Sequence, residues 1–189
     1  MIIIDDNPDQ RFVLKGLLTD IGCEVIAEGA SGLDAVKLLQ NKTPDVVFMD
    51  VAMPGMDGID AVNMIKNLNP LPVILITGKK DEKTIQRATD AGVFAYLVKP
   101  VREEELLPAI ELAIARFNEF QAVKKENIDL KEAIEARKLI ERAKGFLMEK
   151  ERLAEKEAFA FIQKTSMDKR QSMKEVSLAI ISAFGGKKP

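Results

Sequence analysis

Short apolar runs alternate with helix-length amphipathic stretches over the first hundred residues. The runs predict strands near 2–4, 23–27, 45–49, 72–76 and 94–98. The stretches between them predict helices near 8–20, 32–41, 58–67 and 81–91, and a further helix from about 103. The third to fifth runs show little alternation, as expected of strands covered by helices on both faces. The pattern predicts an α/β fold, a doubly wound (βα)5 parallel sheet in the order 2-1-3-4-5.

Beyond about Lys99 the pattern predicts only helices. Apolar residues recur at three- and four-residue steps, interrupted by the polar Asn127, and predict one long helical connection over about 103–150. They are Leu106, Ile110, Ala113, Phe117, Phe120, Val123, Leu130 and Ile134. This stripe could pack against its own domain or against a second subunit. Pro108 should kink or weaken the first turns.

Two further helices are predicted at about 154–169 and 172–184, the second with Ser172 and Glu175 as a capping box. With the end of the long helix they form a small all-α three-helix domain. We therefore expect two domains, 1–120 and 121–189.

Charge is divided unevenly between these two parts. Residues 1–123 hold 12 Lys and Arg against 19 Asp and Glu, whereas residues 124–189 hold 16 against 11. An acidic part suits a cation site, and a basic part suits an anionic partner. The absence of histidine excludes Ser-His-Asp hydrolysis and histidine-ligated metals, and the single Cys23 excludes an internal disulfide. No apolar run of about 18 residues is present, so we expect a cytoplasmic protein with no membrane contact.

Four of the predicted strands end in residues suited to phosphoryl chemistry. They are followed by Asp5 and Asp6, Asp50, Thr77 and Lys99. Individually each could be a helix cap or a solvated surface residue. Because ligands bind beyond the carboxyl ends of parallel strands, these side chains should instead converge on one pocket.

The residue types in this predicted pocket indicate its chemistry. Clustered carboxylates need a cation, and oxygen ligands favour Mg²⁺. Asp50 could accept a phosphoryl group as an acyl phosphate. Lys99 and Thr77 could stabilise the phosphoryl oxygens.

This arrangement resembles the receiver domain of bacterial two-component response regulators, over about residues 1–120. The resemblance implies that a sensor histidine kinase phosphorylates Asp50 and that the protein is not an enzyme beyond slow self-dephosphorylation. It implies that Mg²⁺ is held by Asp5, Asp6, Asp50 and the backbone carbonyl of Ala52. It assigns phosphoryl-stabilising and switch roles to Thr77, the small Gly78, Tyr96 and Lys99.

The basic part closely resembles the ANTAR domain, a three-helix RNA-binding module of transcription antiterminators. The resemblance covers about 125–184 and rests on segments 137–149, 157–159, 167–170 and 175–176. Basic residues on helices are commonly solvated faces, but the resemblance favours RNA. The candidate RNA contacts are Arg137, Lys138, Arg142, Lys144, Lys169 and Arg170.

Together these observations predict a phosphorylation-controlled response regulator that binds RNA hairpins in leader transcripts, promotes antitermination and forms a homodimer when phosphorylated. Two alternatives remain open from the sequence. One is a DNA-binding response regulator, for which no helix-turn-helix pattern is found. The other is a module that docks a protein through its helical stripe, without nucleic acid.

Overall fold

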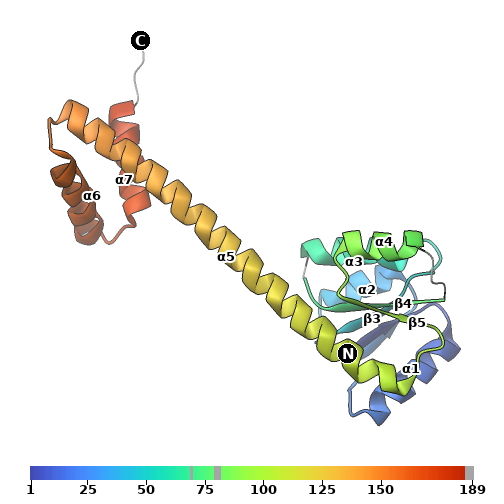
Figure 1. The fold of residues 1–189 in the computed structure, drawn as a ribbon. Helices are drawn as coiled ribbons and strands as arrows, with labels where there is room; N and C mark the ends of the chain where they lie inside the picture. Colours follow the sequence, from blue (N-terminus) through green and yellow to red (C-terminus); the bar gives the residue numbers. More distant parts are fainter. Residues whose placement is uncertain (69, 79–81, 186–189) are drawn as a thin grey trace. The chain divides into compact units, whose positions relative to one another are not determined.

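The computed structural model describes residues 1–68, 70–78 and 82–185. The chain forms two compact units, 1–121 and 122–189. In the first unit, helices cover both faces of a parallel sheet (Figure 1).

The first unit contains a five-stranded parallel sheet in the order β2-β1-β3-β4-β5, which confirms the predicted fold. Its strands are β1 (Ile2–Ile4), β2 (Ala27–Gly29), β3 (Val47–Asp50), β4 (Val73–Thr77) and β5 (Ala95–Val98). Its helices are α1 (Pro8–Asp20), α2 (Gly32–Leu39), α3 (Gly58–Leu68), α4 (Glu82–Ala91) and the beginning of α5 (Glu103–Lys150).

Two hydrophobic cores lie on opposite faces of the sheet. Alternate residues of the central strands point to opposite faces. Ile2, Ile4 and Met49 pack with α2, α3 and α4, whereas Ile3 and Phe48 pack with α1 and α5. The unbroken apolar runs of the central strands therefore follow from burial on both faces.

β2 lies later in the chain than predicted, at Ala27–Gly29 instead of 23–27. Its register explains the shift, because Ile2, the first residue of β1, pairs with Ala27. Residues 23–25 therefore precede the start of the paired ladder. Cys23 and Val25 still pack partly against the core. This partial burial explains why apolar residues occupy these alternate positions outside the strand.

The second unit is built from the end of α5, α6 (Glu155–Lys169) and α7 (Met173–Gly185). Its core contains Ala143 and Leu147 of α5, Ala158 and Ile162 of α6, and Val176 and Ile180 of α7. Arg170 is the C-cap of α6, and its backbone is left-handed at φ 52°. α7 begins with the predicted capping box, in which Glu175 N–H donates to Ser172 Oγ at 3.2 Å and Ser172 N–H donates to the Glu175 carboxylate at 2.7 Å.

The apolar stripe on α5 has two different environments. Leu106, Ile110 and Ala113 are buried in the core of the first unit. Phe117 and Phe120 then contact Phe94, with ring centroids 5.9 and 6.0 Å apart. Every residue from 122 to 135 is exposed. Packing against its own domain therefore accounts for only the first part of the stripe.

Helix α5 continues through Pro108 as one helix, so the proline does not end it.

Across the described residues, no helix combines the length and apolar character needed to span a membrane.

Candidate functional site

Three carboxylates meet at the carboxyl ends of β1 and β3. Asp5 and Asp6 follow β1, Asp50 ends β3, and the two strands are neighbours paired in parallel. Oxygens of the three side chains all lie within 4.8 Å of one another. Asp5 and Asp50 are buried, at 2% and 4% exposure, whereas Asp6 is exposed. The structure therefore brings together the three acids that the sequence predicted to converge.

The residue whose side chain caps α1 is Asn7, and not Asp5 or Asp6. Asn7 accepts hydrogen bonds from the N–H groups of Asp9 and Gln10 at 2.9 and 3.2 Å and so is the N-cap. Asp5 Oδ1 accepts the N–H of Asn7 at 2.8 Å, which fixes the carboxylate at the end of β1. The simple capping explanation for Asp5 and Asp6 therefore does not account for their placement.

Lys99 supplies a positive charge between the two buried acids. Its Nζ lies 2.8 Å from Asp5 Oδ2 and 3.0 Å from Asp50 Oδ2. Lys99 N–H donates to the Thr77 carbonyl at 2.9 Å, which extends the pairing of β4 with β5 and aims the side chain at the pocket. The following peptide bond, to Pro100, is cis.

The negative charge of the buried Asp50 is only partly compensated by the neighbouring groups. Burial raises the pKa of its carboxyl above the ordinary value, and the charge of Asp5 acts in the same direction. The hydrogen bond and charge of Lys99 oppose this shift without cancelling it. Asp50 Oδ1 is buried and accepts no hydrogen bond within the described residues. This carboxylate oxygen is therefore available to bind a cation or to accept a hydrogen bond.

These donors fit a hard divalent cation. Carboxylate oxygens are the ligands that Mg²⁺ prefers, and the unpartnered Asp50 oxygen lies beside two further carboxylates. Ala52, expected to offer its carbonyl, is exposed in the loop two residues after Asp50.

The remaining predicted residues border this pocket on β4 and β5. Thr77 is buried at the end of β4, one residue beyond the partner of Asp50 in the β3–β4 register, and the exposed Gly78 follows it. Tyr96 lies within β5 and is 45% exposed.

Gly58 is a residue of this site that sequence reasoning did not identify. A Cβ atom added there would lie 2.1 Å from the carbonyl oxygen of Asp50. Gly58 N–H also donates to the carbonyl of Val51 at 3.0 Å. Only glycine allows this approach, which closes the loop after β3 over the backbone of Asp50. No local signal reveals this, because the constraint comes from a residue eight positions earlier.

An apolar groove of about 490 Å³ adjoins the carboxylates. Asp5 and Lys99 border it on one side, and Val13, Leu14 and Leu17 of α1 on another. Val13, which lines the groove, and the preceding residue Phe12 are 58% and 79% exposed. The pocket is thus bordered by a surface suited to a protein partner.

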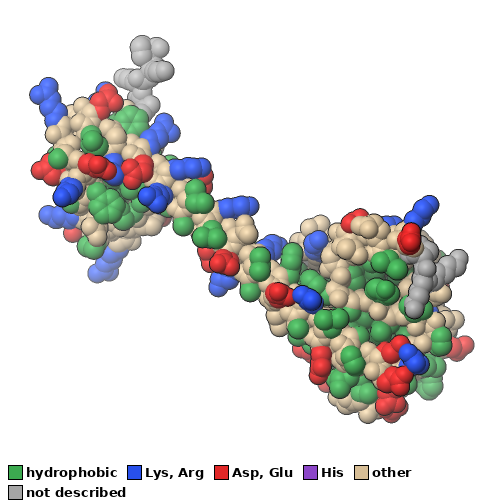
Figure 2. Space-filling model, in the orientation of Figure 1, with side chains coloured by type: hydrophobic (Ala, Val, Ile, Leu, Met, Phe, Trp, Pro, Cys, Tyr) green, Lys and Arg blue, Asp and Glu red, His purple; other side chains and the backbone are tan. Residues whose placement is uncertain are grey.

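The basic candidates of the second unit differ in their availability. Arg137, Lys138, Lys169 and Arg170 are exposed, and Lys138 pairs with Glu135 at 2.8 Å. Arg142 is also exposed and lies over the ring of Phe146, with its Cζ 5.9 Å from the ring centroid. Lysine and arginine side chains project around the visible face of this unit (Figure 2).

Lys144 differs from these five. Its side chain is 9% exposed, and its Nζ lies 3.0 Å from Glu141 Oε2 and 2.8 Å from Glu155 Oε1. Hydrogen bonds from Glu155 and then Glu141 raise the pKa of the ammonium. Lys144 therefore joins α5 to the start of α6 in this structure.

A second groove, of about 630 Å³, is lined by α6, α7, the end of α5 and the loop that follows it. Phe161 and Phe184 line it together with Thr165 and Lys169. It combines aromatic surface with a cation at its edge.

Comparisons with known proteins agree with this architecture. The chain matches the family described as response regulator receiver domain over residues 1–111 and the ANTAR domain over residues 129–181. It is 41% identical to the transcriptional regulatory protein PdtaR of Mycobacterium tuberculosis, over 98% of this chain and 90% of that protein. It is 38% identical to the DNA-binding transcriptional regulator NtrC of Escherichia coli, over 63% of this chain and 25% of that protein.

Solved structures resemble the first unit. A receiver domain protein from Clostridium thermocellum has 34% identity and a TM-score of 0.57, covering 63% of this chain and 96% of that one. The CheX–CheY–BeF3–Mg complex from Borrelia burgdorferi has 28% identity and a TM-score of 0.55, covering 58% and 84%. The receiver match spans more than half of the residues and one relative matches almost the whole length, so the chain belongs to the response regulators that combine a receiver domain with a C-terminal ANTAR domain.

Proposed function

We propose that this response regulator is switched by phosphorylation of Asp50 and, when phosphorylated, binds hairpin RNA in nascent transcripts to promote transcription antitermination. The observation that carries the proposal is the cluster of three carboxylates within 4.8 Å, with Lys99 between two of them, in a chain that also contains an ANTAR domain. The cluster supports the input, and the ANTAR domain supports the output.

Asp50 is the acceptor in this proposal. Its carboxylate oxygen attacks the phosphorus of a phosphohistidine on a sensor kinase, forming an O–P bond while the N–P bond breaks. The electron pair of that bond returns to the histidine nitrogen, and the product is an acyl phosphate. The apolar groove beside Asp5 and Lys99, with the exposed Phe12 and Val13, is the surface on which the kinase would dock.

Mg²⁺ would be held by Asp5, Asp6, Asp50 and the carbonyl of Ala52. When bound, it neutralises charge between the carboxylates and the phosphoryl oxygens. The unpartnered Oδ1 of Asp50 supports this site.

The rest of the pocket stabilises the phosphoryl group. The Lys99 ammonium, already 3.0 Å from Asp50, would neutralise phosphoryl oxygen charge. The Thr77 hydroxyl would donate to the same group, with the small Gly78 leaving room beside it. Tyr96 is half exposed on β5. Its side chain would reorient together with that of Thr77 and so signal the phosphorylated state.

The RNA contacts are proposed on the second unit. Arg137, Lys138, Arg142, Lys169 and Arg170 are exposed and would hold phosphates. An unstacked loop base could stack on Phe161 in the groove next to Lys169. Lys144 would have to release two glutamates to reach a phosphate, so its substitution should weaken RNA binding less than that of Lys169 or Arg170.

Phosphorylation would also favour a homodimer. The exposed α5 stripe at 122–135 supports this step, because it remains available after the rest of α5 has packed. A shift of a few kcal/mol in a pre-existing equilibrium changes occupancy by orders of magnitude.

A gel-shift competition tests the whole proposal. The full chain is incubated with labelled hairpin RNA or duplex DNA, with and without Mg²⁺ and beryllofluoride as the phosphoryl mimic. We expect tighter binding of the hairpin in the presence of the mimic and no response in Asp50→Asn. Preferential binding of duplex DNA would indicate the DNA-binding alternative. Binding of neither nucleic acid in either state would refute the RNA output and leave the phosphorylation of Asp50 standing.

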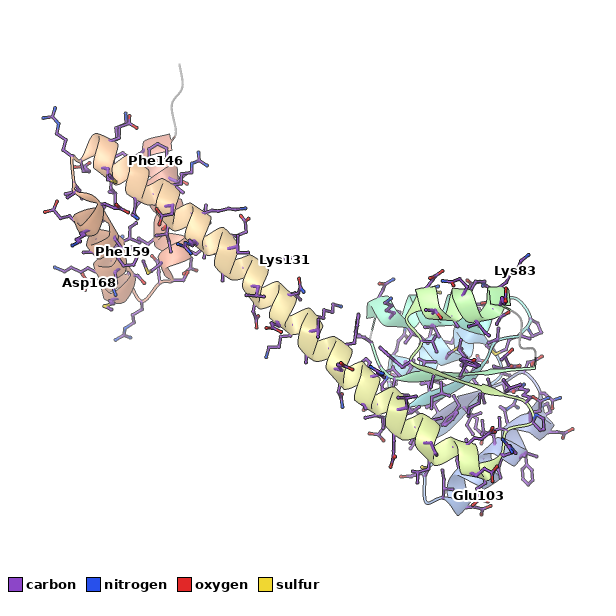
Figure 3. All side chains as sticks on the ribbon, viewed as in Figure 1. Lys83, Glu103, Lys131, Phe146, Phe159 and Asp168 are labelled. Carbon is purple, nitrogen blue, oxygen red and sulfur yellow. The ribbon has the colours of Figure 1, made fainter. Side chains whose placement is uncertain are left out.

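Point variants locate the RNA surface. Lys169→Ala and Arg170→Ala should each weaken hairpin binding by roughly 5- to 10-fold and lower the salt dependence by about one phosphate contact. Lys83→Ala is the matched control, because Lys83 is an exposed lysine on α4 of the receiver unit (Figure 3). Equal losses in all three variants would mean that nonspecific charge explains binding.

A further inference from the structure

Four different residues hold the polar atoms of Asp5. Its N–H donates to the carbonyl of Gly29 at the end of β2, at 3.2 Å. Its two carboxylate oxygens accept hydrogen bonds from Asn7 N–H and Lys99 Nζ, each at 2.8 Å. Its backbone carbonyl accepts a hydrogen bond from Arg11 Nη1 at 2.5 Å. Arg11 therefore contacts this buried acid through the backbone and not through the carboxylate.

The position of Arg11 in α1 explains this contact. Arg11 N–H donates to the carbonyl of Asn7 at 3.1 Å, which places Arg11 one turn into the helix. Side chains of a helix tilt toward its N-terminus, so the long arginine side chain extends back toward the end of β1.

Glu28 of β2 supports the guanidinium from the other side. Its Oε2 lies 3.9 Å from Arg11 Nε, and its Oε1 lies 2.7 Å from Lys15 Nζ. Arginine can contact the Asp5 carbonyl and Glu28 together because its planar guanidinium carries five N–H donors. The Arg11 side chain is 20% exposed, whereas that of Lys15 is 48% exposed.

The carbonyl that Arg11 binds belongs to the peptide that joins Asp5 to Asp6. A peptide group is planar, so a hydrogen bond that fixes the carbonyl also fixes the direction in which the chain continues into Asp6. The Asp6 carboxylate has no hydrogen bond or ion pair within the described residues. Its orientation therefore depends on the backbone that carries it.

We infer that Arg11 is a positioning residue of the divalent-cation site, which orients the Asp6 carboxylate through the Asp5–Asp6 peptide. Glu28 keeps the guanidinium in place for this role. The inference rests on the proposed function, because it assigns a residue to the Mg²⁺ site of that function.

The sign of the effect on metal affinity separates positioning from simple charge. Arg11 places a positive charge beside Asp5, so its removal would strengthen cation binding if charge alone mattered. Loss of a residue that positions a metal ligand has the opposite effect and typically costs about 10- to 100-fold in affinity. Lys15 is the matched control, because it has the same charge, lies on the same helix and pairs with the same Glu28.

Titration of the full chain with Mn²⁺ tests the inference. Mn²⁺ takes the same oxygen ligands as Mg²⁺, and electron paramagnetic resonance measures its free ion. Arg11→Met should bind Mn²⁺ about tenfold more weakly than wild type, whereas Lys15→Met should bind it at least as tightly as wild type. An affinity of Arg11→Met equal to or above that of Lys15→Met would overturn the inference.

Urea unfolding in EDTA, followed by Tyr96 fluorescence, establishes that the variants are folded under the conditions of the titration. Arg11→Gln also removes the charge and is too short to reach the carbonyl. It replaces Arg11→Met with the same expected loss if the methionine variant does not fold.

A double variant tests whether the effect depends on Asp6. In an Asp6→Asn background the carboxylate that Arg11 orients is absent, so adding Arg11→Met should weaken Mn²⁺ binding by less than about twofold. A general disturbance of the receiver unit would instead weaken binding equally in both backgrounds. A tenfold loss in the Asp6→Asn background would therefore overturn the inference.

The wild type in the same titration separates this inference from the proposed function. If wild type binds no Mn²⁺, the metal site of the proposed function is wrong, and the role of Arg11 is wrong with it. If wild type binds Mn²⁺ and Arg11→Met binds it as tightly, only the role of Arg11 is wrong and phosphorylation of Asp50 stands.

Discussion

Replacing Asp6 with asparagine should stabilise the Mg²⁺-free receiver unit and also reduce its stabilisation by Mg²⁺. The Asp6 carboxylate has an oxygen within 4.8 Å of oxygens of Asp5 and Asp50. Among the described residues it has no hydrogen bond or ion pair. The substitution therefore removes repulsion without removing a hydrogen bond or ion pair of the described residues.

The size of the effect follows from these distances. Two unit charges 4.8 Å apart repel by about 0.9 kcal/mol at the dielectric constant of water and by about 3.5 kcal/mol at an effective value of 20. Asp6 is exposed, so the lower figure applies to each of its two neighbours. The two repulsions together set an upper limit of about 2 kcal/mol, which the Lys99 ammonium beside Asp5 and Asp50 lowers, so we expect about 1 kcal/mol, or roughly 4 °C for a unit of this size.

Mg²⁺ should act in the opposite sense on the two proteins. At ten times its dissociation constant, a ligand stabilises the folded state by about 1.4 kcal/mol. Wild type should therefore gain roughly 5 °C, and Asp6→Asn much less.

Tyrosine fluorescence provides a specific assay. Tyr96 is the only tyrosine, and the chain has no tryptophan, so this signal follows the receiver unit alone. Thermal unfolding is measured in EDTA and in Mg²⁺, with Asp45→Asn as the control for an exposed aspartate outside the cluster. If Asp6→Asn is no more stable than wild type in EDTA, or gains as much from Mg²⁺, the charge cluster has been described wrongly.

Three further predictions use the same fluorescence signal during urea unfolding. Without Mg²⁺, Asp50→Asn should be more stable than wild type at pH 7, and the difference should vanish as the pH falls toward 3.8. The pKa of Asp50 is raised by burial, so the folded wild type loses stability as the pH rises above that ordinary value and the buried carboxyl ionises; a constant difference would contradict this. Gly58→Ala should destabilise the unit by roughly 2 kcal/mol or more through its clash with the Asp50 carbonyl, whereas Gly16→Ala, with open space in α1, should stabilise it by about 1 kcal/mol; similar effects of the two would refute the close approach. Phe94→Ala should cost about 2 kcal/mol through its lost contacts with Phe117 and Phe120, while the exposed Phe12→Ala should be nearly neutral; equal effects would show that the aromatic contacts do not hold α5.

The grouping of the pocket residues could be predicted because it depends on topology alone. Once the chain is an open parallel sheet, Asp5, Asp50 and Lys99 follow strands and must lie at one edge. The start of β2 could not be predicted in this way. Residues 23–26 (Cys-Glu-Val-Ile) are more apolar than the paired residues 27–29 (Ala-Glu-Gly), and only the register with β1 shows which of them form the strand.

Lys144 illustrates the limit of reasoning from charge. In the sequence it resembles its basic neighbours, and the pairing with Glu141 three residues earlier is compatible with an exposed helix. The second partner, Glu155, comes from another helix and depends on the tertiary fold. Gly58 is similar, because its contact with Asp50 depends on the path of the loop between them.

The balance of charges around Asp50 has one more consequence. With all groups ionised, three carboxylates face one ammonium among the described residues, so these residues leave an excess of two negative charges. An incoming phosphoryl donor is itself an anion and is repelled by this excess. The regulator should therefore require two inputs together, an active phosphoryl donor and sufficient divalent metal. When Mg²⁺ is scarce, it should remain unphosphorylated even while its kinase is active.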